Sequence, residues 1–190
     1  MTSSGVAAER ALIGGAQQNL PRNATFYYWL FIAGFFTFVL HEAAHWVAGS
    51  ALGYDMQARL NAVTATTAVL PAHKAMIDAA GPLVTILQAL VAFAFVIRYR
   101  ANTAFVFLYM AAFMRVLASA ISVFNPNDEA RLSVYLGLGT WTLPIAVSLA
   151  LLVLTWRASQ RLTLTWKEHV LCYLTASASI SLIVAIDRLF

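Results

Sequence analysis

The chain has 190 residues, of which 61% are hydrophobic and only 11% are charged. This balance excludes a water-soluble globular domain and predicts an integral membrane protein, because runs of about 20 apolar residues cross the hydrocarbon core of a bilayer as helices. The net charge of +4 comes from Lys and Arg at the ends of these runs. Such a distribution bears on membrane topology, and we therefore expect the lipid bilayer, and no nucleic acid, as a partner.

Residues 1–25 are rich in Gly, Ser, Gln and Asn and lack the basic start and short apolar core of a signal peptide, which predicts a flexible or surface-lying tail. Residues 26–190 are expected to form a single membrane-embedded catalytic domain. We predict an all-α polytopic protein with about five transmembrane helices, in the plasma membrane of a prokaryote. The predicted spans are 26–52, 76–97, 103–123, 140–156 and 168–186.

The first span contains His41-Glu42-Ala43-Ala44-His45. On a helix, residues four apart lie nearly above one another, so both histidines can bind one metal ion while Glu42 faces the water that the metal activates. A shuffled chain of this composition would contain the pattern with a probability of roughly 0.002. The alternative is a pair of packing histidines, which we disfavour because His and Glu are costly in hydrocarbon and are kept there mainly for functional or paired roles.

Residues 56–63, which follow the first span, alternate between apolar and polar side chains with the period of a β-strand. A Thr-rich continuation leads to Pro71, so two short strands forming a hairpin are plausible. An ordinary polar loop fits the pattern equally well, because no Asn-Gly or Asp-Gly turn fixes a register.

Two further features lie in the second and third spans. Gly81-Pro82 is expected to open the second span, since Pro is tolerated in the first turn of a helix and Gly lets another helix approach closely. Arg115 lies deep in the third span, where an arginine normally faces the protein interior. It is expected to pair with Asp128, Asp78 or a substrate carbonyl, or else to extend toward the interface.

The segment between the third and fourth spans supplies carboxylates on the same side of the membrane as the end of the first span. Pro126 breaks the helix there, and Asn127 or Asp128 can cap the next one. A hydrolytic zinc ion requires three protein ligands and one open position, so the two histidines need a third ligand. Asp128 is the first candidate, with Glu129 and Asp78 as alternatives.

These features together resemble the site-2 protease family of intramembrane zinc metalloproteases, at the size of the family's bare membrane core. The resemblance covers roughly residues 26–140. The histidine motif in a span is its specific part, and it is supported by the alternating segment, by Gly81-Pro82 and by Asn125 and Pro126 just ahead of Asp128. The family commonly has Leu-Asp-Gly some residues after Asn-Pro, which this chain lacks, so Glu129 remains open as the third ligand.

The resemblance implies that His41, His45 and Asp128 bind one Zn²⁺ per chain and that Glu42 is the general base. The implied activity is hydrolysis of peptide bonds in transmembrane protein substrates by a zinc-activated water. A transmembrane helix must unwind before attack, and a strand edge within residues 56–70 is a plausible holder for the unwound peptide. A regulatory membrane protein is a possible further partner. Supporting or substrate-binding roles fall to Asn125, Arg115, Gly81 and Pro82.

Two other functions compete with this interpretation. One is a membrane metallopeptidase resembling the HtpX type, whose third ligand is a glutamate, for which Glu129 is the candidate. The other is a non-catalytic subunit of a membrane complex with a structural metal site. A structural site would be closed by a fourth protein ligand, and His73 is the residue that would supply it.

The two predictors of membrane orientation disagree. Seven Lys and Arg residues flank the predicted spans on the amino-terminal side and four on the other, which places the amino terminus in the cytoplasm and the histidine motif toward the opposite face. The family resemblance implies the reverse, so the sequence leaves the orientation open.

Overall fold

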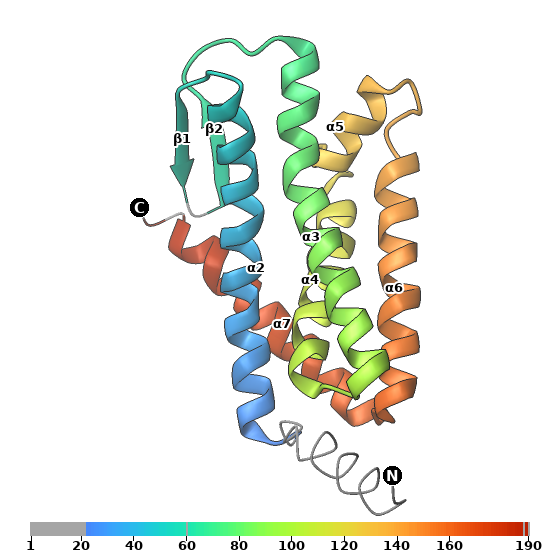
Figure 1. The fold of residues 1–190 in the computed structure, drawn as a ribbon. Helices are drawn as coiled ribbons and strands as arrows, with labels where there is room; N and C mark the ends of the chain where they lie inside the picture. The colour runs from blue at the N-terminus through green and yellow to red at the C-terminus, as the bar shows by residue number, and fades with distance from the viewer. Residues whose placement is uncertain (1–21, 60, 188, 190) are drawn as a thin grey trace, which may run out of the picture.

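The structure, a computed structural model, describes residues 22–59, 61–187 and 189. Among these, five helices are long and apolar enough to cross a membrane, which confirms the predicted polytopic all-α fold (Figure 1). They are α2 (Ala24–Ala51), α3 (Pro71–Tyr99), α4 (Asn102–Ile121), α6 (Thr142–Leu162) and α7 (Trp166–Asp187). A short helix, α5 (Asp128–Tyr135), and two strands, β1 (Met56–Arg59) and β2 (Ala62–Ala65), complete the described elements.

Most of the predicted tail, residues 1–21, lies outside the described residues. Helix α2 begins at Ala24, inside the last four residues of the predicted tail. The Asn23 side chain accepts a hydrogen bond from the Thr25 amide there, at 3.0 Å. A side chain that satisfies one of the unpaired amides at a helix start favours the start at that point.

The second span begins earlier than expected, and the prediction that Gly81-Pro82 opens its helix is wrong. Helix α3 starts at Pro71, which takes the first-turn position, so Pro82 lies in the helix interior. The polar turns around Lys74 and Asp78 extend the helix beyond its apolar run, where hydropathy gives no signal. Pro82 has no N–H for the Asp78 carbonyl, and such a gap is tolerated where neighbouring elements satisfy the backbone around it.

The hairpin after α2 is present. Strands β1 and β2 pair antiparallel, with Met56 opposite Ala65 and Arg59 opposite Ala62. The hairpin folds back onto α2, because the Trp46 indole donates to the Met56 carbonyl at 3.2 Å and Gly49 has no Cβ to obstruct the Met56 side chain.

Helix α4 packs against all four of the other long helices, and α2 packs against α3, α4 and α7 on one side of the bundle. Small residues allow the close approach to α7: Gly34 faces Ser179, whose hydroxyl donates to the Phe31 carbonyl at 2.7 Å. The core around these contacts is apolar and fully buried, with Leu30, Phe105 and others. The buried face of α2 carries His41 and His45, so these two histidines lie inside the bundle.

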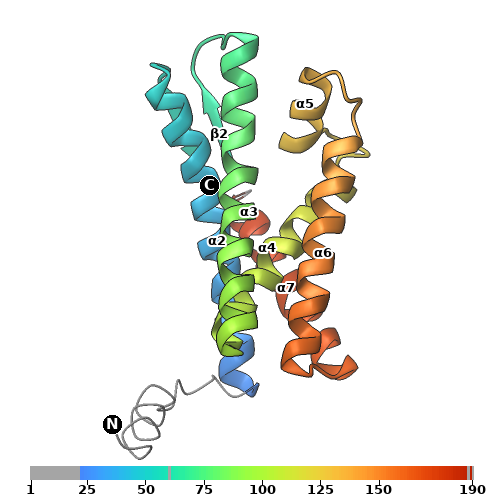
Figure 2. The ribbon, with the colours of Figure 1, turned by 45° about the vertical axis from the view of Figure 1, so that its right-hand side comes forward.

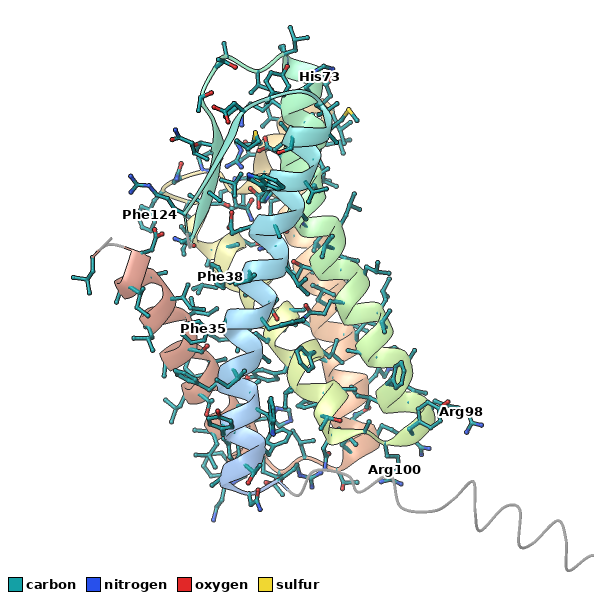
Figure 3. The ribbon with its side chains drawn as sticks, turned by 60° about the vertical axis from the view of Figure 1, so that its left-hand side comes forward. Phe35, Phe38, His73, Arg98, Arg100 and Phe124 are labelled. Atoms are coloured by element: carbon teal, nitrogen blue, oxygen red, sulfur yellow. The ribbon has the colours of Figure 1, made fainter. Side chains whose placement is uncertain are left out.

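The two ends of the bundle differ in charge and in content. Arg98 and Arg100 lie at one end and His73 at the other (Figure 3). The hairpin, the start of α3 and the short helix α5 gather at the His73 end, as two views of the ribbon show (Figures 1 and 2). This is the end toward which the histidine motif of α2 lies.

Candidate metal centre

Both histidines of the motif lie on the buried stripe of α2. Thr37, His41, His45 and Gly49 follow one another at intervals of four and are all buried. Glu42, one position around the helix, is partly exposed and lines the cavities beside the motif. As the sequence predicted, the four-residue spacing puts the His41 and His45 imidazoles on the same face of α2.

Helix α5 brings Asp128 to the histidines. Pro126 ends the preceding turn, and the Asn127 side chain caps α5 by accepting from the Ala130 amide at 2.8 Å. Asp128 is thereby placed in the first turn, with its Oδ2 atom 3.0 Å from His41 Nε2 and 3.5 Å from His45 Nε2. Ligand atoms of the three residues lie within 4.8 Å of one another, close enough to bind one metal ion.

The hydrogen bonds of the imidazole Nδ1 atoms fix which nitrogen carries the proton. His45 Nδ1 lies 2.6 Å from the Ile77 carbonyl, which only accepts, so this nitrogen is the donor. His41 Nδ1 lies 3.1 Å from Thr85 Oγ1, and the Thr85 hydroxyl already donates to the Gly81 carbonyl at 3.0 Å. His41 Nδ1 is therefore also a donor, and in both neutral rings Nε2 carries the lone pair.

The consequence is a convergence of acceptors. The two Nε2 atoms are 3.1 Å apart, and Asp128 Oδ2 lies beside both. Neutral imidazoles with these tautomers have no proton to place between them, so their lone pairs and the carboxylate repel one another. A bound cation converts this repulsion into coordination, and the outward hydrogen bonds from Nδ1 are those that metal-binding histidines make.

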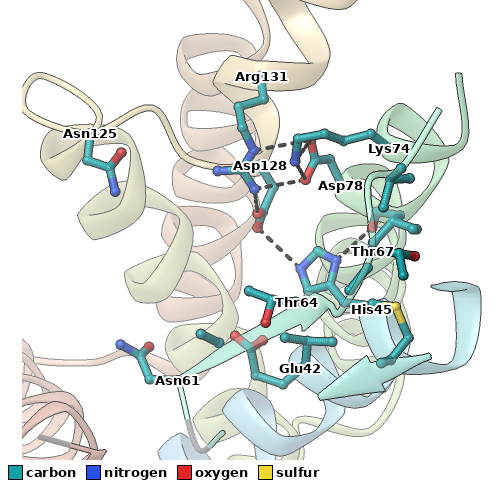
Figure 4. A pocket seen from close by; sticks show the side chains of 16 residues that line it. Glu42, His45, Asn61, Thr64, Thr67, Lys74, Asp78, Asn125, Asp128 and Arg131 are labelled. Atoms are coloured by element: carbon teal, nitrogen blue, oxygen red, sulfur yellow. Dashed lines mark hydrogen bonds and ion pairs between the residues drawn. The ribbon is translucent and has the colours of Figure 1, made fainter. Parts of the chain in front are cut away.

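Asp128 is held by its second oxygen. Arg131 Nη2 donates to Asp128 Oδ1 at 2.6 Å and to Asp78 Oδ1 at 2.9 Å, while Arg131 Nε donates to Asp78 Oδ2 at 3.1 Å (Figure 4). Burial opposes the charge of Arg131, but its interactions with the two carboxylates raise its pKa above the ordinary value. This arrangement leaves Asp128 Oδ2 facing the histidines. Asp78 thus supports the centre from a distance, and the structure does not bring it into the group of ligands.

Glu129 points away from the centre. Its Oε1 atom pairs with Arg115 Nη1 at 2.9 Å, and its Oε2 atom accepts from Asn127 at 2.7 Å. Arg115 Nη1 also lies 3.8 Å from Asp128 Oδ2, which is one of the pairings expected from the sequence, but its closer partner is Glu129, which was not among them. Because Glu129 is buried and engaged by Arg115, the geometry gives no support to a third ligand at this position.

The remaining predicted residues take separate places. His73 Nδ1 lies 2.9 Å from the Tyr54 hydroxyl and is not part of the metal-binding group. Asn125 lines both cavities at the centre. Two residues that complete the site escaped the sequence analysis, namely Thr85 and Arg131. Their only sequence signal was spacing, since Thr85 follows Gly81 by one helical turn and Arg131 follows Asp128 by three residues.

Gly81 sits against the two histidines. A Cβ atom at this position would overlap His45 Nε2 and would lie 2.5 Å from His41 Cε1. Glycine is therefore required here so that α3 can approach the motif of α2, which is the close approach that the sequence predicted.

We expect Gly81→Ala to weaken metal binding about 10- to 100-fold or more, because the added methyl displaces the imidazoles, and lesser losses of supporting contacts already have effects of this size. Metal analysis of the purified protein at graded free zinc measures it. Gly34→Ala is the matched control, since its Cβ meets Ser179 on α7 and not the centre. It is expected to lower thermal stability and to keep the metal; equal metal affinity in parent and Gly81→Ala would contradict the expectation.

Two cavities meet at the centre. The larger, of about 610 Å³, lies between the hairpin, α3 and α5 and includes every residue of β2, whereas only Met56 comes from β1. The smaller, of about 280 Å³, lies on the side of α4 and α7. Glu42 and Asp128 line both. The Glu42 carboxylate makes no hydrogen bond to another residue in the described part of the chain, so it is available to whatever enters.

No protein-family model matches the chain, and no curated protein or solved structure was found to match it.

Proposed function

We propose that the protein is an intramembrane zinc metalloendopeptidase that hydrolyses peptide bonds of transmembrane protein substrates. The observation that carries the proposal is the convergence of His41 Nε2, His45 Nε2 and Asp128 Oδ2 beside Glu42. Two lone pairs and a carboxylate that meet without a proton favour a cation. The carboxylate next to them, on a helix long and apolar enough to span a membrane, favours hydrolysis there.

The ligand set supports zinc and an open site. Two imidazole nitrogens and one carboxylate oxygen form a common catalytic set for zinc, and a fourth position is then open to water or substrate. No fourth His, Cys, Asp or Glu joins the group among residues 22–59, 61–187 and 189. When bound, zinc acidifies water and polarises a carbonyl.

The chain's own residues divide the remaining tasks. Glu42 accepts the proton of the attacking water and delivers it to the leaving amine. Arg131, which is itself paired with Asp78, holds Asp128 in place by donating to its Oδ1 atom. The larger cavity admits the substrate, which must be locally unwound because a helix satisfies its carbonyls internally. Within the described part of the chain, strand β2 pairs with β1 alone, so its other edge is available to bind an extended peptide in that cavity.

Proline substitutions in β2 test whether that edge holds the substrate. Successive amides of a strand point to opposite edges, so Val63→Pro and Thr64→Pro remove one amide each from the inner and the outer edge. We expect the variant that lacks the outer amide to cleave several-fold to about tenfold more slowly, which corresponds to one lost main-chain hydrogen bond. Cleavage rate and metal content are measured together. If both variants match the parent rate, substrate is not bound by strand addition.

The proposed function is tested on the purified protein in detergent micelles. Metal content is expected to be near one zinc ion per chain, and a mixture of single-span model peptides is expected to yield new fragments by mass spectrometry. Removal of the metal with a chelator should stop cleavage, and added zinc should restore it. A parent that binds no zinc contradicts the proposal, and one that binds zinc and cleaves none of the peptides favours a non-catalytic metal-binding subunit.

A further inference from the structure

The smaller cavity, here called the recess, is contiguous with the candidate metal centre. It lies between α2, α4, α7 and residues 125–127, and it has a volume of about 280 Å³. Its polar lining includes His41, Glu42 and Asp128 of the centre and the arginines beside them, Arg115 and Arg131. The remaining walls come from three different helices and are apolar: Phe38, Met114, Leu117, Ala118, Ile121, Ile180 and Val184.

The size of the recess limits its occupant. One turn of an α-helix, with a diameter of about 10 Å and a length of 5.4 Å, occupies roughly 420 Å³. The recess, at about 280 Å³, is too small for that, but it exceeds the volume of a single leucine or phenylalanine side chain. The recess is therefore too small to enclose a helical turn, and one large side chain fits.

Both arginines that line the recess pair with carboxylates, and the proposed function assigns the Glu42 carboxylate to the attacking water, so the other walls contribute mainly apolar contact. Arg115 pairs with Glu129, and Arg131 bridges Asp78 and Asp128. A charged occupant would lose its hydration against the apolar walls, and an anionic one would gain no unpaired counter-charge from the two arginines. An aliphatic or aromatic side chain gains from burial there, and a thioether such as that of Met114 adapts to differently shaped apolar groups.

We propose that the recess is a specificity pocket that receives a large apolar side chain flanking the scissile bond. This inference rests on the proposed function of the metal centre. In an extended peptide, successive side chains point to opposite faces. Because the larger cavity and the recess share Glu42 and Asp128, a peptide lying along β2 with its carbonyl at the centre turns one neighbouring side chain into the recess.

Amino-acid hydroxamates test the pocket without requiring cleavage, since a hydroxamate is a bidentate ligand for zinc. We expect leucine and phenylalanine hydroxamates to bind the zinc-loaded parent at least 10-fold more tightly than alanine hydroxamate, by isothermal titration. One methylene in an apolar pocket typically changes binding about 10-fold or more. Ala118→Phe fills the recess and is expected to reduce this preference to threefold or less, with alanine hydroxamate binding and zinc content unchanged.

The matched control is Ala120→Phe, since Ala120 is exposed on the same helix and does not line the recess. It should retain the full preference. Val184→Phe fills the recess from α7 and serves where Ala118→Phe fails to fold or loses zinc. Equal binding of the three hydroxamates by the parent, or an undiminished preference in a recess-filling variant that retains zinc, would overturn the inference.

Single-span peptides that differ only in Ala, Leu or Phe beside the mapped cleavage site complete the test. Faster cleavage with Leu or Phe, lost in Ala118→Phe, is the expected result. Equal cleavage of all three peptides overturns the specificity pocket and leaves the proposed protease intact. If none is cleaved while the hydroxamate preference persists, the protease proposal fails and the recess stands only as an apolar pocket beside a metal site.

Discussion

Glu42→Gln is expected to reduce the rate of peptide cleavage by at least 100-fold while leaving one metal ion bound per chain. Glutamine has nearly the same shape as glutamate but does not take up the proton of an attacking water, and a general base of this kind contributes about 10²- to 10⁴-fold to a rate. Glu42 is not one of the three clustered ligand residues, so the substitution should leave the metal site intact. Initial rates on a single-span peptide and metal analysis of the same preparation measure both effects.

Two results would contradict this assignment of Glu42. A variant that cleaves within threefold of the parent rate would show that Glu42 is not the base. A variant that loses its metal would show that Glu42 supports the ligands. Glu129→Gln is the matched control, because Glu129 lies close by but is engaged by Arg115 and Asn127. Its rate per metal-loaded molecule is expected to stay near that of the parent.

The sequence predicted those parts of the fold that depend on local pattern. The apolar runs predicted the five helices long enough to span a membrane, which the structure confirms. The period of two after the first span left a hairpin and a polar loop open, and the structure shows the hairpin. Helix ends were predicted less well. Helix α3 extends through the polar residues Lys74 and Asp78 to Pro71, and hydropathy responds to the hydrocarbon and not to a helix that continues into the polar region.

Within the His41, His45 and Asp128 cluster, too, one part follows from local pattern and the other does not. His41 and His45 are four residues apart on one helix, so the helical repeat alone brings them together. Asp128 lies far along the chain, and it was selected because a broken segment with carboxylates follows Pro126 on the same side of the membrane. The structure places it with the histidines, and its role as a ligand stays a prediction.

The contacts that support the centre depended on helix packing, and residue spacing was the only local signal for any of them. Thr85 and the Ile77 carbonyl orient the imidazoles only because α3 lies against α2, with Gly81 at the contact. The pairing of Arg115 with Glu129 joins α4 to α5. The expectation that a deep arginine faces the interior was confirmed, but sequence alone did not distinguish among the carboxylates that it might meet.

Asp128→Ala is expected to weaken zinc binding by at least 100-fold and to abolish cleavage. The loss of zinc affinity should exceed the 10- to 100-fold that is typical when a group hydrogen-bonded to a metal ligand is mutated, because Asp128 is itself a proposed ligand. The substitution also removes the negative charge that pairs with Arg115 and Arg131 beside the centre. Arg131 would keep Asp78 and Arg115 would keep Glu129, but Arg115 lies 3.8 Å from the present position of Asp128 Oδ2, so its charge would no longer be shared with a carboxylate beside the histidines.

Glu129→Gln separates this outcome from a general loss of structure. It leaves Arg115 buried without its carboxylate, and breaking such a buried pair lowers stability by about 3–5 kcal/mol. We therefore expect Glu129→Gln to lower the melting temperature yet to bind one zinc ion per folded chain, and Asp128→Ala to lose the zinc in protein that remains folded. The reverse pattern, with zinc retained in Asp128→Ala and lost in folded Glu129→Gln, would transfer the third ligand to Glu129 and favour the glutamate type of membrane metallopeptidase.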